Sequence, residues 1–221
     1  MTGGRFQKLP PERRAVILGA IAAEVAEHGF AGASVTRIAE RAETSKASLF
    51  YYFADRDEML AAAVGAFFEQ VLGLPPDGGA PLPVPAPAKD FWAGIEELYR
   101  SAVERMRADP ARARFAHAWL EVMGRSDPPP ALRPFVDRAR AMVDALVSAG
   151  VERGAIRPGF PTPLLSRTLF AFVVAADGWM AETVLHRNMP MESAVELVLG
   201  LVRAAFEAPR PAKERAPKKG R

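Results

Sequence analysis

Cysteine is absent from the 221-residue chain, which excludes disulfides, cysteine-ligated zinc sites and thiol catalysis. Histidine is rare, and His28, His117 and His186 lie far apart, without the spacing of a metal site. The chain also lacks a glycine-rich phosphate loop and a nucleophile elbow. We therefore expect that the protein is not an enzyme and that it holds no metal and no cofactor.

Long uncharged apolar runs are also missing. No stretch of about 18 such residues occurs, so we expect no membrane span. Residues 1–10 lack the apolar core of a signal peptide, which predicts a soluble, cytoplasmic protein. The chain is 49% hydrophobic and 25% charged, a balance that is typical of a globular protein with a sizeable core.

The charge is unevenly distributed, although the net charge is only +3. Residues 1–56 hold 8 Lys and Arg against 6 Asp and Glu, whereas residues 57–208 hold 15 against 19. Residues 209–221 hold 6 Lys and Arg against 1 Glu. Basic ends around an acidic middle favour a polyanionic partner, although a solvated surface can show the same pattern.

Apolar residues recur at three- and four-residue spacing, and no segment shows the sustained alternation of a β-strand. The prediction is an all-α protein of about nine helices. The expected helices cover residues 11–28, 35–42, 45–52, a segment starting after 55, 89–108, 110–125, 132–154, 164–187 and 191–207.

Two proline-rich segments lie outside these helices. Residues 73–88 contain six prolines and three glycines, so we predict a linker loop there. Residues 209–221 combine proline with basic residues, and we predict a disordered tail. This tail would either increase solubility or add nonspecific affinity for nucleic acid.

The segment SVTRIAERAETSKASLFYYFADRDEML, residues 34–60, contains two short helices joined by a turn. Ser34, Ser45 and Asp55 stand where helix N-caps are expected, and Glu58 completes a capping box with Asp55. This pattern predicts a helix-turn-helix whose second helix enters the major groove of DNA. The residues expected to face inward are Val35, Ile38, Ala39, Ala42, Leu49, Phe50 and Phe53.

Over residues 12–65 the chain resembles the TetR family of bacterial transcriptional regulators. The matching residues are Gly29-Phe30, Ser34-Val35, Ile38-Ala39, Ala42, Ser45-Lys46, Leu49-Phe50, Tyr52-Phe53, Asp55-Arg56-Asp57-Glu58 and Leu60. The resemblance implies an N-terminal three-helix helix-turn-helix DNA-binding domain (residues 1–56) and a larger helical ligand-binding and dimerisation domain (residues 57–208). One departure is Glu43, which stands where the family usually has a glycine in the turn. A left-handed backbone there would cost about 1 kcal/mol.

The resemblance implies a double-stranded operator as the partner of this motif. Phosphates would be held by hydroxyl and cationic side chains, and small side chains would let the backbone approach the bases. For single positions, a solvated cation or a core tyrosine is the alternative. The candidate DNA-binding residues are Ser34, Thr36, Arg37, Ser45, Lys46, Ala47, Ser48, Tyr51, Tyr52 and Arg56. An N-terminal arm along the DNA, or a frayed terminus, is predicted for Arg5, Lys8, Arg13 and Arg14.

A short recognition helix reads few base pairs, so we expect a homodimer on a palindromic site. The resemblance implies that the last two helices pair with those of a second copy; packing within one chain is the alternative. The apolar residues expected on these helices are Leu165, Leu169, Phe172, Val173, Ala176, Met180, Val195, Leu199, Val202 and Phe206.

The resemblance also implies a repressor that leaves the operator when a small, largely apolar effector binds. A regulator that is controlled by a protein partner, or that has no effector, is the alternative. A solvent-open pocket lined by both polar and apolar groups would favour a small effector. A tightly filled core would favour control by a protein partner or the absence of an effector. The candidate ligand-binding residues are Trp92, Tyr99, Phe115, Trp119 and Phe170.

Overall fold

The computed structural model describes residues 4–74, 91–186 and 189–209. Most of the predicted linker loop 73–88 and of the predicted tail 209–221 therefore lies outside the described residues. The described chain holds nine α-helices and a short 3-10 helix, which confirms the all-α prediction. The elements are η1 (Phe6–Lys8), α1 (Pro11–Gly32), α2 (Val35–Arg41), α3 (Lys46–Tyr52), α4 (Arg56–Leu72), α5 (Phe91–Arg107), α6 (Pro110–Met123), α7 (Arg133–Glu152), α8 (Thr162–His186) and α9 (Met191–Phe206).

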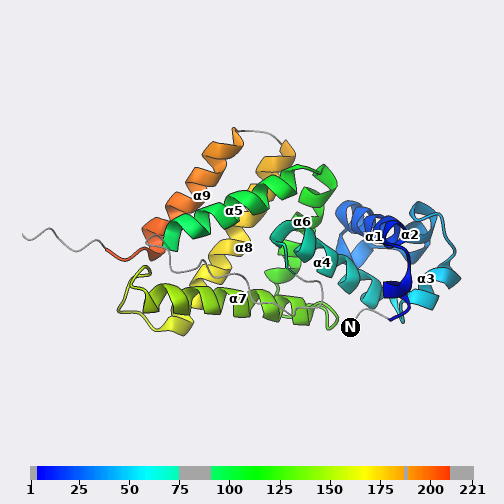
Figure 1. Ribbon diagram of the computed structural model, residues 1–221, viewed down its shortest axis with the longest axis horizontal. Helices are drawn as coiled ribbons and strands as arrows, with labels where there is room; N and C mark the ends of the chain where they lie inside the picture. The colour runs from blue at the N-terminus through cyan, green and yellow to red at the C-terminus, as the bar shows by residue number, and fades with distance from the viewer. Residues whose placement is uncertain (1–3, 75–90, 187–188, 210–221) are drawn as a thin grey trace, which may run out of the picture.

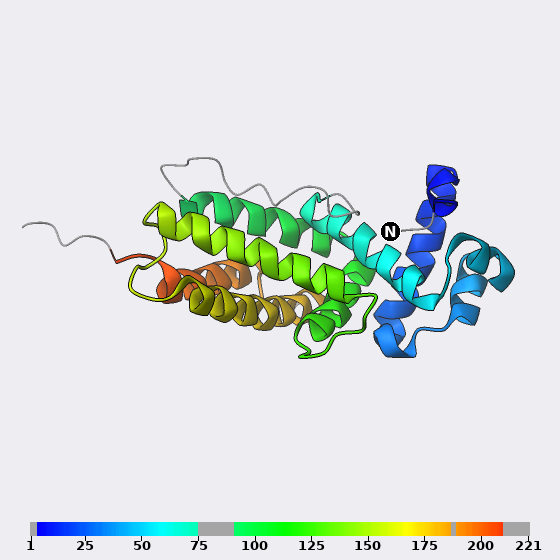
Figure 2. The same cartoon turned by 90° about the horizontal axis from the view of Figure 1, so that it is seen from below.

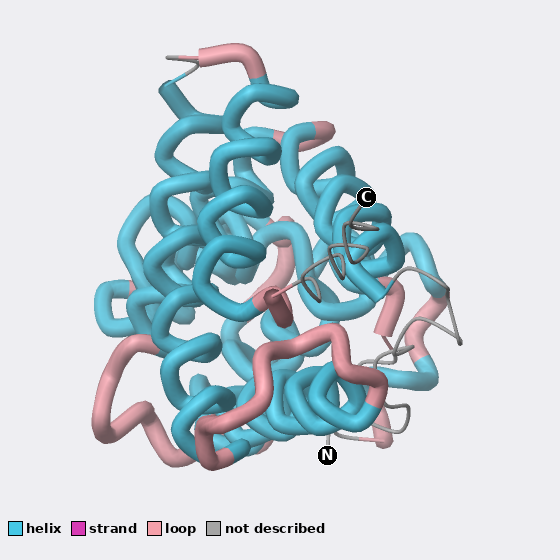
Figure 3. The backbone as a smooth tube through the Cα atoms, turned by 90° about the vertical axis from the view of Figure 1, so that its left-hand side faces the viewer, coloured by secondary structure: helices cyan, strands magenta, loops and turns pink. Residues whose placement is uncertain are grey.

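The helices are arranged in two groups along the long axis of the molecule. Helices α1, α2 and α3 form one end, and α5, α7, α8 and α9 form the other, with α4 and α6 between them (Figures 1 and 2). Viewed from the α9 end, the described backbone consists of helices and loops alone (Figure 3). The recognition helix α3 therefore lies at the end of the molecule that is opposite α9.

Several helix starts follow from local capping. The Oγ of Ser45 accepts the N–H of Ser48 at 3.0 Å, and Oδ1 of Asp55 accepts the N–H of Glu58 at 2.8 Å. Glu58 in turn accepts the N–H of Ala54 at 2.6 Å, so the capping box reaches one residue further back than predicted. Asp109 caps α6 by accepting the N–H of Ala111 at 2.9 Å.

A glycine bends the C-terminal end of α1. Gly29 has φ 67° and ψ 171°, a conformation that interrupts the helix as its position in the sequence predicted. The chain then makes one more turn and returns Phe30 to the core, where its side chain is only 7% exposed. The bend thus places α2 at the angle to α1 that the helix-turn-helix needs.

One hydrophobic cluster joins the two groups of helices. The ring of Phe30, just after the bend in α1, lies 5.6 Å from the ring of Phe115 and 6.2 Å from that of Trp119, both on α6. The same cluster includes Leu49 of α3 and Val136 of α7. The cluster therefore connects α4, α6 and α7 with the helices of the helix-turn-helix segment. The predicted boundary between residues 56 and 57 stays a prediction.

Two segments are long and apolar enough to cross a membrane by length and composition: Pro11–Gly32 and Thr162–Thr183. No such segment was expected, because the sequence lacks an apolar run of this length without charged residues, but a helix with one or two charged residues also meets the criterion. The core helices of a soluble protein meet it as well. Here α1 packs against α4 and α6, and α8 packs against α6, α7 and α9.

Candidate nucleic-acid interface

Helix α3 is anchored by one face and exposed on the other. Leu49 is fully buried and Phe53, just after the helix, is 1% exposed, whereas Lys46 and Ala47 are exposed. The prediction that Phe50 faces inward is wrong, because its side chain is 49% exposed. Leu49 and Phe53 are four residues apart and share the inner face, which turns the next position, Phe50, towards solvent.

The two tyrosines of α3 have different surroundings. Tyr51 is 58% exposed, and the guanidinium of Arg5 lies 4.7 Å from the centre of its ring. Tyr52 is half-buried, and its ring is 5.3 Å from that of Tyr51. Tyr51 thus offers its hydroxyl outward beside a cation, while Tyr52 also packs against the core.

The N-terminal segment is folded against this helix from residue 5 onward. Phe6 is 2% exposed, and its ring lies 4.7 Å from that of Phe53. Arg14 on α1 donates to the side-chain oxygen of Gln7 at 2.9 Å and to its backbone oxygen at 3.2 Å. These contacts favour a fixed arm over a frayed terminus and place Arg5 beside α3.

Arg37 of α2 binds a buried acid. Glu24 on α1 has no exposed surface, and Arg37 donates its Nε–H to Glu24 at 2.7 Å. Ser34 does not cap α2 with its side chain; its N–H donates to Glu24 at 3.0 Å instead. Burial raises the pKa of Glu24, but the hydrogen bonds from Arg37 and Ser34 hold that pKa below its ordinary value. Arg37 and Glu24 therefore fasten α2 to α1.

Arg56, also predicted to contact phosphate, lies against the end of α1. Its Nε–H donates to the carbonyl of Ala33 at 2.9 Å, and its terminal N–H groups donate to Phe30 and Ala31. These carbonyls are left without helical partners by the bend at Gly29 and the end of α1. The sequence could not reveal this role, because the acceptors lie more than twenty residues away along the chain.

The turn between α2 and α3 has the irregularity that the sequence indicated. Glu43 has φ 47°, within the left-handed region, and the described chain has no other positive-φ residue except glycine. Arg13 on α1 donates to the carbonyl oxygen of Glu43 at 3.3 Å. The strained turn is thus held from α1. Of the remaining DNA-binding candidates, Thr36 is exposed on α2, and the hydroxyls of Ser45 and Ser48 are 2.9 Å apart at the start of α3.

The five candidate ligand-binding aromatics belong to three separate hydrophobic clusters. Phe115 and Trp119 belong to the cluster that joins the two ends of the molecule, and Phe170 packs on it. Trp92 belongs to a second cluster, where its Nε1–H donates to Ala155 at 3.2 Å. Tyr99 packs on a third and donates its hydroxyl to Asp177 at 3.1 Å.

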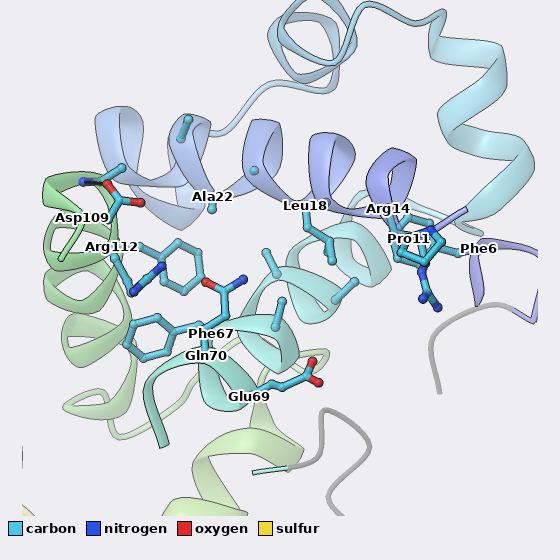
Figure 4. Close-up of a pocket in the computed structure, with 18 of the residues that line it drawn as sticks. Phe6, Pro11, Arg14, Leu18, Ala22, Phe67, Glu69, Gln70, Asp109 and Arg112 are labelled. Carbon is cyan, nitrogen blue, oxygen red and sulfur yellow. Dashed lines mark hydrogen bonds between the residues drawn. The ribbon is translucent and has the colours of Figure 1, made fainter. Parts of the chain in front are cut away.

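A cavity of about 550 Å³ lies at the junction of η1, α1, α4 and α6 (Figure 4). Of the predicted ligand-binding residues, this cavity is lined by Phe115 alone. The cavity could not be predicted from the sequence, because alanine and glycine form much of its wall and its polar residues come from four separate elements. Within the described ranges, no group of three or more His, Asp or Glu side chains could hold a metal ion.

Helices α8 and α9 expose a different face from the predicted one. Leu165, Leu169 and Met180, expected at a dimer contact, are buried inside the chain, as are Val195, Leu199 and Phe206. The exposed apolar residues on these helices are Leu164 (52%), Trp179 (39%), Leu197 (52%) and Leu201 (60%). The buried residues lie where α8 packs against α6 and α7 and where α9 packs against α5. The outer face of α8 and α9 is exposed to solvent.

Comparison with known proteins agrees with this architecture. Residues 17–63 match the model of the bacterial regulatory proteins of the tetR family. A TetR family transcription regulator from Marinobacter aquaeolei VT8 superposes with a TM-score of 0.64 at 24% identity, covering 88% of this chain and 95% of that one. One from Chloroflexus aurantiacus J-10-FL has a TM-score of 0.59 at 20% identity, covering 94% and 99%.

The transcriptional regulator FadR from Bacillus subtilis, solved in complex with stearoyl-CoA, is also similar, with a TM-score of 0.62 at 15% identity, covering 84% of this chain and 95% of that one. No curated protein matches the sequence. The N-terminal helices thus form a tetR-type helix-turn-helix. The match over residues 17–63 and the similar fold agree with the resemblance of the sequence to the TetR-family transcriptional regulators.

Proposed function

We propose that the protein is a cytoplasmic transcriptional repressor that binds a palindromic operator as a homodimer and releases it when a small effector binds. The observation that carries this proposal is the outward-facing recognition helix. Lys46, Ala47 and Tyr51 are exposed, and α3, which carries them, lies at one end of the molecule (Figure 1). Residues 1–56 would read DNA, and residues 57–208 would dimerise and respond to the effector.

The proposed contacts follow from the geometry of α3. Lys46 and the Ser45 hydroxyl stand at the N-terminal end of α3, where backbone N–H groups also favour phosphate. Ala47 and Ser48 are small enough for a close approach to base edges. Arg37 and Arg56 are instead assigned a positioning role, because both are already held by groups of the chain.

The proposed dimer uses the outer faces of α8 and α9. Trp179, Leu197 and Leu201 form an exposed apolar surface that a second copy would cover. A two-fold axis roughly parallel to the long axis of the molecule would place α3 of both copies at the same end of the dimer, because α3 lies at one end of that axis (Figure 1). The two recognition helices would then reach successive major-groove segments of a two-fold symmetric site.

Fluorescence anisotropy tests DNA binding directly. The full chain is titrated onto a labelled duplex carrying an inverted repeat from upstream of its own gene or of the divergent neighbour. We expect tighter binding to this duplex than to a scrambled one. Lys46→Ala should weaken binding and lower the salt slope by about one, as expected for the loss of a phosphate contact. The control is Arg107→Ala, at an exposed arginine that pairs with Glu104 on its own helix. Equal affinity for the repeat and the scrambled duplex refutes the proposal.

The effector has indirect support. FadR from Bacillus subtilis shares the fold and was solved with stearoyl-CoA, and the junction cavity offers a mixed polar and apolar lining. These points favour a small effector over control by a protein partner.

A further inference from the structure

We propose that the cavity between η1, α1, α4 and α6 binds an elongated amphipathic organic anion. The inference rests on the proposed function and gives it a site that differs from the five predicted aromatics. At about 550 Å³ the cavity falls in the range of ~300–1,000 Å³ that is usual for small-molecule sites. Its lining on α1 runs from Pro11 to Ala23, about 18 Å at 1.5 Å per residue. A long, narrow ligand therefore fits better than a compact one.

The middle of the cavity suits an unbranched apolar body. Ala15, Gly19 and Ala22 of α1 face Ala63 and Ala66 of α4 across it. Because these side chains are small, the two helices leave space that larger residues would fill. A Cβ added at Gly19 would meet no atom within 4 Å. The walls thus offer apolar contact area in this middle section, and the amide of Gln70 adds a polar group beside it (Figure 4).

The α6 end of the cavity suits the anionic group. Arg112 lies there beside Gln70 and above the ring of Phe67 (Figure 4). It donates one N–H to the carbonyl of Arg105, whereas a guanidinium carries five N–H donors. Of the two acids that line the cavity, Glu69 extends away from Arg112 in Figure 4, and the carboxylate of Asp109 accepts the N–H of Ala111. The first turn of α6 adds a field that favours negative charge.

An occupant of this cavity would touch the helix-turn-helix directly. Phe6 lines the cavity and stacks on Phe53, which directly follows α3. Phe67 of α4 lines it as well, and α4 begins at Arg56, the residue that holds the end of α1. A ligand that separates α1 from α4 would therefore shift α3 relative to the rest of the chain. Binding that favours the shifted arrangement would lower DNA affinity.

Isothermal titration calorimetry tests the site, with dodecanoate as the probe below its micelle concentration and dodecanol as its uncharged counterpart. We expect one dodecanoate per chain. Gly19→Leu should weaken both ligands at least about tenfold, because the new side chain fills the cavity. Arg112→Gln should weaken dodecanoate at least about tenfold and dodecanol little, because only dodecanoate carries a charge. Arg114→Gln, at an exposed arginine of α6 outside the cavity lining, is the control and should change neither affinity by more than about twofold.

The outcomes separate the site from the proposed function. Circular dichroism and thermal unfolding check that each variant folds, and Ala22→Met replaces Gly19→Leu if the latter does not. Failure of dodecanoate to bind, or binding that the cavity-filling variant leaves unchanged, overturns the site while DNA binding stands. Dodecanoate that binds as expected but leaves operator affinity unchanged supports the site and refutes its role in release.

Discussion

Replacing Arg37 by methionine separates a structural role from a DNA contact. The side chain of Arg37 is 44% exposed, and one of its nitrogens lies 2.6 Å from the fully buried carboxylate of Glu24. Removing one partner of a buried ion pair costs about 3–5 kcal/mol when the other charge is left alone. Here Arg41 remains 3.4 Å from the second carboxylate oxygen, and Arg37 itself is partly solvated. We therefore expect Arg37→Met to lower the free energy of unfolding by about 2 kcal/mol at neutral pH.

The expected loss depends on pH in a direction that the pKa of Glu24 sets. That pKa lies below its ordinary value of 4.5 in the folded chain, so the ionised carboxylate stabilises the fold. The contribution of ionised Glu24 to the free energy of unfolding is complete above the pKa that Glu24 has in the unfolded chain. It is lost as the pH falls through the pKa that Glu24 has in the folded chain. The difference in the free energy of unfolding between wild type and Arg37→Met should therefore be largest at pH 7 and decrease towards about pH 3.

Urea unfolding, monitored by circular dichroism across this pH range, measures this difference in the free energy of unfolding directly. At neutral pH the melting temperature of Arg37→Met should fall by about 4–8 °C for a chain of this size. Thr36→Ala, at an exposed neighbour on α2, is the control and should stay within about 0.5 kcal/mol of wild type. A loss of DNA affinity without any loss of stability would refute the positioning role. A stability loss of equal size at pH 7 and pH 3 would refute its ionic origin.

Three further predictions concern other parts of the chain. Burial raises the pKa of Asp177 to about 6, partly offset by the hydrogen bond from Tyr99, so stability should fall as the pH rises from about 4 to 6. Asp177→Asn should remove this pH dependence. At pH 8 its free energy of unfolding, measured by urea titration, should be roughly 2 kcal/mol higher than that of the wild type. Glu43→Gly should raise the melting temperature by about 2–4 °C, because it relieves a left-handed φ of 47°; an unchanged melting temperature would contradict the strain. Leu201→Glu, at a residue 60% exposed on α9, should yield monomers by analytical ultracentrifugation, and a dimer of unchanged strength would place the interface elsewhere.

Local signals in the sequence predicted the helices well because their physics is local. The caps at Ser45, Asp55 and Asp109 bond to N–H groups two or three residues away, so their effect can be read from spacing alone. Gly29 ends the regular part of α1 for the same reason: its φ of 67° suits glycine. The expected cap at Ser34 did not form with its side chain. The backbone N–H of Ser34 instead donates to the buried carboxylate of Glu24, ten residues earlier on α1.

The candidate site was harder to predict because long side chains choose partners through space. Arg37 and Arg56 have the charge of phosphate contacts, yet their nearest acceptors belong to α1 and the segment after it. Aromatic residues such as Trp92 and Trp119 mark a core but do not say whether that core is hollow. The junction cavity has the opposite signature, since an absence of side-chain volume at positions such as Gly19 creates it.

These contacts decide how a signal could reach α3. A flexible hinge between two independent domains is a poor account, because Phe30 packs on Phe115 and joins both ends of the molecule in one cluster. Helix α1 carries the cavity wall around Gly19 and, one turn later, the acid Glu24 that holds α2. Any displacement of α1 from α4 must therefore move the helix-turn-helix as a unit. In the proposed dimer, such a movement would change the spacing of the two α3 helices, whereas the contacts within each helix-turn-helix would stay intact.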